Sequence, residues 1–290
     1  MSRAAGRLSI VGTPIGNLED ISRRAVRTLG EADVIYCEDT RRTRKLLSAL
    51  GLPSPRLVRV DAHNEADMAA AVISALESGA NAAFVTDAGM PTVSDPGSRL
   101  VAAVGASGHR LEVVPGPSAS IAALALSGLP GPQYRFVGFL PRKGGERSAV
   151  LADVADSPVT VVIYEAANRV ERTVADLAQR CDPGRPLVAA KELTKLHEEV
   201  WRGPIEAASA WISGFDQLRG EWVLLVGPRA PEQPAEPAEL DRRAVLALEA
   251  RLAEGVERKV AVAEVSALLG MAKRRVYDLA VELKRSSPPS

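Results

Sequence analysis

Short apolar runs alternate with stretches of helical periodicity through the first three quarters of the chain, and this alternation constrains the fold more than any other feature. The first series of runs comprises 8–11, 34–37, 57–60, 82–86 and 111–114, and the second comprises 136–139, 159–164, 187–191 and 222–226. Each run has the length of a strand, and turn or polar residues follow it. The pattern predicts two tandem α/β domains, at 1–117 and 118–228.

The stretches between the runs predict helices at 23–29, 43–50, 67–77, 96–106, 118–126, 145–155, 169–179 and 205–212. Asp95 precedes Pro96. Because proline suits the first turn of a helix, we expect Asp95 to cap the helix that Pro96 starts.

The end of the chain has a different composition. Residues 229–239 are proline-rich, polar and acidic, which is typical of a semi-rigid linker. Beyond them the periodicity is helical, and Val276, Leu279, Ala280 and Leu283 fall on one helix face. We expect a small all-α module of three helices at 240–290.

Charge and cysteine content exclude several classes of protein. The formal net charge is zero, so any nucleic-acid binding must be local rather than driven by a global field. Cys37 and Cys181 lie far apart without nearby histidine pairs, which argues against a disulfide framework and a structural zinc site. The chain has no signal core and no apolar run of membrane-spanning length. We expect a cytoplasmic protein without a metal.

Three strand ends open into loops rich in glycine and proline, at 11–20, 84–97 and 113–120. The first loop is weak evidence alone, because it matches neither the dinucleotide fingerprint nor a phosphate loop. The second places two glycines and two prolines around Asp87 and Asp95. These residues constrain the backbone conformation more than a simple turn needs. The third opens a helix with small residues and is equally compatible with a domain hinge. Ligands of α/β proteins bind at the carboxyl ends of strands, so the second loop is a candidate ligand wall.

Polar clusters follow four other runs, at 38–42, 61–65, 164–165 and 191–195. They would converge on one crevice if the sheets are largely parallel. Taken singly, each cluster is explained as well by a helix cap or a surface ion pair.

In their order, these loops and clusters resemble the tetrapyrrole methylase-like superfamily of S-adenosylmethionine enzymes (class III), and within it the ribosomal RNA small subunit methyltransferase I family. The resemblance spans about residues 8–228 and rests on Val11–Leu18, Glu38–Arg41, His63–Glu65, Asp87–Gly89, Asp95–Gly97, Pro115–Pro117, Gly138–Pro141, Tyr164–Glu165, Glu192–Lys195 and Gly220–Glu221. The first loop lacks the Gly-x-Gly-Pro-Gly-Asp run expected in the porphyrin-modifying branch.

The resemblance implies an activity and a cofactor. The activity is 2′-O-methylation of a cytidine ribose in the decoding region of small-subunit (16S) ribosomal RNA by a homodimer, with S-adenosylmethionine bound in the cleft between the two α/β domains. Carried over residue by residue, the expected cofactor contacts are Pro14, Asp87, Ala88, Gly89, Pro91, Ser118, Ala119, Tyr164, Leu193, Glu221 and Val223.

A ribose hydroxyl is a weak nucleophile until it loses its proton, so a base should lie near it. The candidates at strand ends are Asp39, His63, Glu65, Lys191 and Glu192, and the sequence does not choose among them. A lysine would need a lowered pKa, whereas a carboxylate or histidine is available at neutral pH.

Basic residues near these clusters and in the last helix are candidates for RNA phosphates, namely Arg41, Arg42, Lys195, Lys273, Arg274 and Arg275. The module at 240–290 resembles the helix-turn-helix domain appended to some members of the ribosomal branch. It holds ten Lys/Arg against seven Asp/Glu, which suits phosphate contact or a solvated helix face. Two other functions stay open: methylation of a tetrapyrrole or another small acceptor, and nucleic-acid binding controlled by a ligand.

Overall fold

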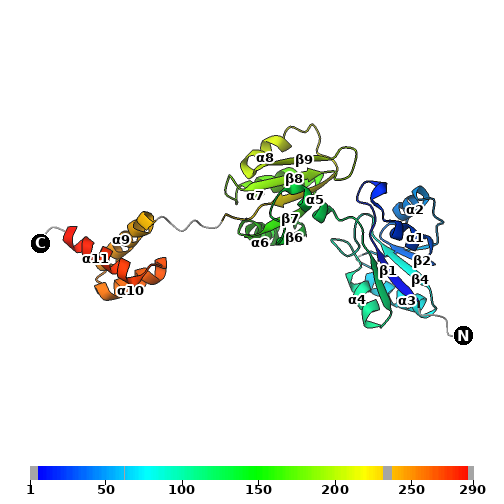
Figure 1. The fold of residues 1–290 in the computed structure, drawn as a ribbon, viewed down its shortest axis with the longest axis horizontal. Coiled ribbons are helices and arrows are strands. Elements are labelled where there is room, and N and C mark those ends of the chain that lie inside the picture. Colours follow the sequence, from blue (N-terminus) through cyan, green and yellow to red (C-terminus); the bar gives the residue numbers. More distant parts are fainter. Residues whose placement is uncertain (1–5, 62, 231–236, 287–290) are drawn as a thin grey trace. The chain divides into compact units, whose positions relative to one another are not determined.

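A computed structural model describes residues 6–61, 63–230 and 237–286 (Figure 1). Its internal contacts divide the chain into two compact units, 1–229 and 230–290. The larger unit contains two five-stranded sheets, and the smaller contains three helices. The predicted fold class is confirmed.

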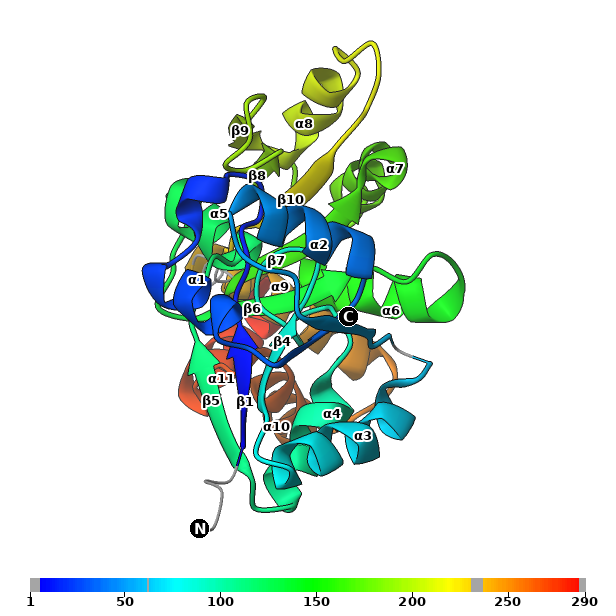
Figure 2. The same ribbon diagram turned by 90° about the vertical axis from the view of Figure 1, so that its right-hand side faces the viewer.

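The first sheet has strand order β3-β2-β4-β1-β5 and is parallel throughout. Its strands are β1 (Arg7–Val11), β2 (Val34–Cys37), β3 (Arg56–Arg59), β4 (Asn81–Val85) and β5 (Arg110–Val114). The two faces are covered by different helices (Figure 2): α1 (Arg23–Gly30) and α2 (Thr40–Ala49) on one, and α3 (Glu65–Glu77) and α4 (Ser98–Ala106) on the other. Burial on both faces explains why its central strands read as continuous apolar runs.

The second sheet is mixed, with order β6-β7-β10-β8-β9. Its strands are β6 (Tyr134–Phe139), β7 (Thr160–Ala166), β8 (Pro186–Lys191), β9 (Glu199–Pro204) and β10 (Glu221–Val226). Only β6 and β7 run parallel. Strand β9 was not predicted from the sequence, because its side chains at the edge of the sheet are half-buried or exposed and its residues form no apolar run.

Helices also cover both faces of this sheet. One face packs against α6 (Gly144–Ala155), α7 (Ala167–Ala178) and α8 (Ile205–Ile212). The other packs against α5 (Ala119–Ser127), together with Ile15 from the first half of the chain. Ile15 is 8 % exposed and shares this cluster with Val223 and Leu193. An apolar contact therefore joins the first loop to the second sheet.

Helix α4 does not start as the sequence suggested. It begins at Ser98, with Gly97 as the N-cap, and Pro96 lies outside it. Asp95 does not cap it. The buried carboxylate of Glu65 takes that role, accepting hydrogen bonds from Gly97 N at 2.6 Å and Arg99 N at 3.0 Å. A long-range cap of this kind leaves no local sequence signal.

The smaller unit consists of α9 (Pro237–Ala253), α10 (Arg258–Leu269) and α11 (Lys273–Ser286), packed around Leu248, Val265, Val276 and neighbouring apolar side chains. The three residues from Pro237, expected in the linker, form the first turn of α9, where the fixed φ of proline is favourable. Residues 231–236 of that linker lie outside the described residues. No described helix is long and apolar enough to cross a membrane.

We predict that Gly97→Ala destabilises the protein strongly. Gly97 has φ +122°, and a Cβ there would lie 2.1 Å from Cε1 of the buried Phe84. The loss should be about 2 kcal/mol or more, measured as the fall in unfolding free energy by urea titration followed by circular dichroism.

Gly108→Ala is the matched control, since Gly108 also has a left-handed φ (+77°) but no atom within 4 Å of the added Cβ. It should lose only the backbone contribution of about 1 kcal/mol. Equal losses in the two variants would contradict the packing role of Gly97.

Candidate active site

The three glycine- and proline-rich loops of the first half are joined by their backbones. Thr13 and Gly89 exchange two hydrogen bonds, with N···O distances of 2.9 and 3.1 Å. Gly12 lies against Gly116 so closely that a Cβ on Gly12 would be 2.6 Å from the Gly116 Cα. The carboxyl ends of β1, β4 and β5 therefore present one continuous surface.

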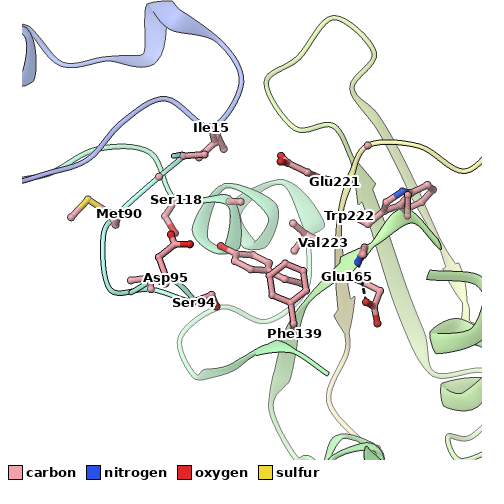
Figure 3. A pocket seen from close by; sticks show the side chains of 18 residues that line it. Ile15, Met90, Ser94, Asp95, Ser118, Phe139, Glu165, Glu221, Trp222 and Val223 are labelled. Carbon is pink, nitrogen blue, oxygen red and sulfur yellow. Dashed lines mark hydrogen bonds between the residues drawn. The ribbon is translucent and has the colours of Figure 1, made fainter. Parts of the chain in front are cut away.

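This surface forms one wall of a pocket of about 330 Å³ (Figure 3). The opposite wall comes from the second sheet, at the ends of β6 and β7 and the start of β10. The lining residues are Ile15, Ala88, Gly89, Met90, Val93, Ser94, Asp95, Ser118, Ala119, Phe139, Tyr164, Glu165, Ala166, Ala167, Gly220, Glu221, Trp222 and Val223. Because β7 and β10 are antiparallel, with Tyr164 paired to Val223, the end of one strand meets the start of the other.

Aromatic rings form part of the second wall. Tyr164 packs edge-on against Phe139, with ring centroids 5.7 Å apart, and Phe139 is 55 % exposed. The Tyr164 hydroxyl accepts a hydrogen bond from Ser120 N at 3.0 Å, in the first turn of α5. Tyr164 therefore fixes the start of α5 against the second sheet.

Asp95, Glu165 and Glu221 are the residues with carboxylate side chains among those that line the pocket. The Glu165 carboxylate is fully buried and bonded to Thr173 Oγ1 (2.6 Å) and Arg169 (3.1 Å). Glu165 therefore contributes mainly its backbone to the pocket wall. Glu221 is 71 % exposed and bonded to Lys195. Asp95 lies with Met90 and Ser94 on the wall of the first half (Figure 3). Burial raises the pKa of Asp95 to about 6, as do Glu38 and Asp87 nearby, while the Thr86 hydroxyl opposes the shift.

Seven of the residues expected to contact the cofactor line the pocket: Ala88, Gly89, Ser118, Ala119, Tyr164, Glu221 and Val223. Four do not. Pro91 and Leu193 are buried, and Pro14 precedes the lining residue Ile15. Asp87 lies against α2, where it accepts from Asp39 N (3.2 Å) and pairs with Arg42 (3.4 Å).

The cofactor contacts expected from the sequence do not include Ile15, Met90, Val93, Ser94, Asp95, Phe139 and Ala166–Ala167, although the loops at 11–20 and 84–97 already contain the first five. Ile15, Asp95 and Phe139 lie inside the stretches that carry the family resemblance, and the others lie within one or two residues of such a stretch, so strand-end position was the available signal. Asp95 was assigned to a helix cap instead. Phe139 is apolar, so the search for polar residues at strand ends did not select it.

Each candidate base either has a hydrogen-bond or ion-pair partner within the protein or lies away from the pocket. Hydrogen bonds from the side chain and backbone of Arg41 lower the pKa of Asp39 to about 2. Burial acts to raise the pKa of Glu192, but the hydrogen bonds from Lys195 and Glu221 N outweigh it and lower the pKa. Both carboxylates are therefore weak bases.

The other three candidates lie elsewhere. The Lys191 ammonium is 4.3 Å from the Phe215 ring centroid and near Trp222, on the sheet face that carries α7 and α8. His63 is exposed in the turn after β3. Glu65 caps α4.

The basic side chains expected to contact RNA phosphates differ in their exposure and in their ion-pair partners. Arg41 and Arg42 are 86 % and 68 % exposed, although each has a carboxylate partner. Lys195 lies between Glu192 Oε1 (2.8 Å) and Glu221 Oε2 (2.9 Å). Arg275 pairs with Asp241 and so joins α11 to α9. Lys273 and Arg274 are exposed at the start of α11 and have no ion pair within the described part of the chain.

Comparison with known proteins assigns the family. Residues 7–209 match the family model of tetrapyrrole (corrin/porphyrin) methylases. The chain is 43 % identical to "Ribosomal RNA small subunit methyltransferase I" of Xylella fastidiosa, over 81 % of this chain and 86 % of that protein. It is 38 % identical to the protein of the same name from Mesorhizobium japonicum, over 97 % and 93 % of the two chains. The chain belongs to the tetrapyrrole methylase family, in the group of ribosomal RNA small subunit methyltransferase I.

A solved structure has the same fold as this family member. Uroporphyrin-III C-methyl transferase from Thermus thermophilus, complexed with S-adenyl homocysteine, superposes with a TM-score of 0.54 at 23 % identity, over 76 % of this chain and 97 % of that one.

We predict that Tyr164→Phe destabilises the second half by about 1 kcal/mol, because Ser120 N loses its acceptor. All three tryptophans, Trp201, Trp211 and Trp222, lie in this half, so urea unfolding followed by their fluorescence reports on it. Tyr134→Phe is the control, since no hydrogen bond of its hydroxyl occurs among the described residues. Equal stability of the Tyr164→Phe variant and the unmutated chain would contradict the role of the hydroxyl.

Proposed function

We propose that this chain transfers the methyl group of S-adenosylmethionine to a cytidine ribose 2′-hydroxyl in the decoding region of small-subunit ribosomal RNA. The observation that carries the proposal is the near-full-length similarity to relatives named ribosomal RNA small subunit methyltransferase I. Such a substrate places the enzyme in the cytoplasm.

The pocket fits the proposed cofactor chemically. Ser118 makes no side-chain cap for α5, and Ser118 and Ala119 at the start of this nine-residue helix line the pocket, a position that suits a carboxylate group. Asp95 and Glu221 supply negative charge for an ammonium or sulfonium group. Ile15, Val223 and Phe139 supply apolar contacts for flat or aliphatic groups. Bound here, S-adenosylmethionine would supply an electrophilic methyl group.

Different parts of the chain would hold the RNA. We assign phosphate contacts to Arg41 and Arg42 beside the pocket loops and to Lys273 and Arg274 on the helical module. Lys195, held by two carboxylates, is assigned instead to closing the rim of the pocket. We also propose a homodimer, which the exposed apolar side chains Val113 and Ile121 support.

The test is methyl transfer from methyl-labelled S-adenosylmethionine to purified, unmethylated small ribosomal subunits, with a tetrapyrrole and duplex DNA as controls. We expect label in 2′-O-methylcytidine after nuclease digestion of the RNA. Label in the tetrapyrrole and none in RNA would refute the proposal and favour a small acceptor.

We predict that Lys273→Ala combined with Arg274→Ala weakens binding to ribosomal RNA and leaves S-adenosylmethionine affinity unchanged. The slope of log K against log salt should fall in magnitude by about 1 to 2, because two phosphate contacts are lost. Arg242→Ala with Arg243→Ala removes the same charge from α9, where both cations already pair with Glu239. Equal changes in the two double variants would contradict a specific role for the start of α11.

A further inference from the structure

Helix α11 carries an aromatic side chain on its solvent-exposed surface. Tyr277 is 53 % exposed, although its neighbour Val276 is fully buried in the core of the helical module. An aromatic ring that stays in contact with water forgoes the free energy that its burial would contribute. A single exposed apolar side chain is common on protein surfaces, so the groups around Tyr277 decide what it can do.

The charged side chains of α11 divide into two groups around the helix. Asp278 and Glu282 both act electrostatically on Arg275, which pairs with Asp241 of α9. The acidic side chains of α11 that follow Tyr277 therefore gather on the side of Arg275.

Tyr277 lies between the two other cations of the first turn. It follows Lys273 by four residues and Arg274 by three, which places it about 40° from one and about 60° from the other around the helix axis. Side chains at these spacings are neighbours on a helix surface. Lys273 and Arg274 are exposed and have no ion pair among the described residues. Together the three residues form a basic stripe with a tyrosine ring in it.

The turn before α11 fixes the backbone that carries this stripe. Gly270 ends α10 with a left-handed φ of +63°. Ser266 and Met271 then exchange two hydrogen bonds: Met271 N donates to Ser266 O at 3.1 Å, and Ser266 Oγ donates to Met271 O at 2.6 Å. Val276 and Leu279 pack into the core of the module. A fixed backbone lowers the entropy that a ligand must overcome to bind the stripe.

A ring between two unpaired cations matches the chemistry of an unpaired nucleic-acid strand. The cations neutralise phosphates, and the ring offers a face on which a base can stack. Unpaired bases can leave their own stack and lie on an aromatic side chain. In an RNA duplex the bases are stacked on one another, and side chains cannot read the deep, narrow major groove.

We propose that Lys273, Arg274 and Tyr277 bind an unpaired segment of RNA, with Tyr277 stacked on a base and the two cations on the flanking phosphates. This inference rests on the proposed function, which makes ribosomal RNA the partner. It gives the helical module a preference for loops and single strands, which phosphate contacts alone would not provide.

The test uses the full chain and two RNA probes. One is a fluorescein-labelled oligouridylate, which stays unpaired, and the other is the same strand annealed to oligoadenylate. Fluorescence anisotropy gives both values of Kd without S-adenosylmethionine. Tyr277→Ala should raise Kd for the oligouridylate about tenfold and change Kd for the duplex by less than about twofold. Because stacking releases no counterions, the slope of log K against log salt should not change.

Three further variants separate stacking from other roles of the tyrosine. Tyr277→Phe keeps the ring and should bind the oligouridylate within about twofold of the unmutated chain. Tyr277→Leu keeps an apolar side chain without a ring and should bind about as weakly as Tyr277→Ala. Tyr134→Ala removes a tyrosine that is 40 % exposed on β6 and should leave both Kd values unchanged. Circular dichroism of each variant checks that it is folded.

Three results would overturn the inference. The first is an unchanged affinity of Tyr277→Ala for the oligouridylate. The second is an equal or larger loss for the duplex, which would make α11 a helix that reads a groove. The third is a loss in Tyr277→Phe as large as in Tyr277→Ala, which would make the hydroxyl a phosphate donor.

Failure of this inference and failure of the proposed function are distinguishable, because anisotropy needs no methyl transfer. The expected changes in Kd, together with no label transferred to ribosomal RNA, would refute the proposed function alone. Label in 2′-O-methylcytidine, together with an unmoved Kd in Tyr277→Ala, would refute the stacking role alone.

Discussion

Two close backbone approaches hold the candidate site together: Gly12 against Gly116, and the paired hydrogen bonds between Thr13 and Gly89. They fix the carboxyl ends of three parallel strands into a single wall. Ile15, two residues after Thr13, then packs into the core of the second half beside Val223. The pocket and the start of α5 depend on this arrangement, because a Cβ at Gly12 or Gly116 would push the loops apart.

The acidic residues near this wall divide according to their partners. Asp39 and Glu192 have lowered pKa values because arginine or lysine donors and backbone N–H groups stabilise the ionised form. Glu65 is used to cap α4. Asp95 has acidic neighbours and a raised pKa, although it lies in the same region of the sheet. Environment, rather than residue type, therefore separates the pKa values of these carboxylates.

Sequence predicted the elements that depend on local patterning. Apolar runs located nine of the ten strands, and the glycine-rich strand ends located the wall that contains Ala88, Gly89 and Ser118. Edge strand β9 escaped because its sides are only partly buried. The polar clusters were expected to converge only if the sheets were largely parallel. In the mixed second sheet, Tyr164 and Val223 instead meet through antiparallel pairing.

Long-range contacts account for the other differences. The cap of α4 comes from Glu65, more than thirty residues away, so the neighbouring Asp95 was assigned the wrong role. The pKa shifts that separate Asp95 from Asp39 also depend on neighbours from other elements, which a single sequence does not reveal.

A crystal structure of the full chain with S-adenosylhomocysteine would show directly whether the pocket between the two sheets binds the cofactor. We expect the ligand to lie between Gly89 and Val223, with its carboxylate at the start of α5 and its sulfur on the side of Asp95. Ligand density outside this pocket, or a sulfur turned away from Asp95, would contradict this expectation.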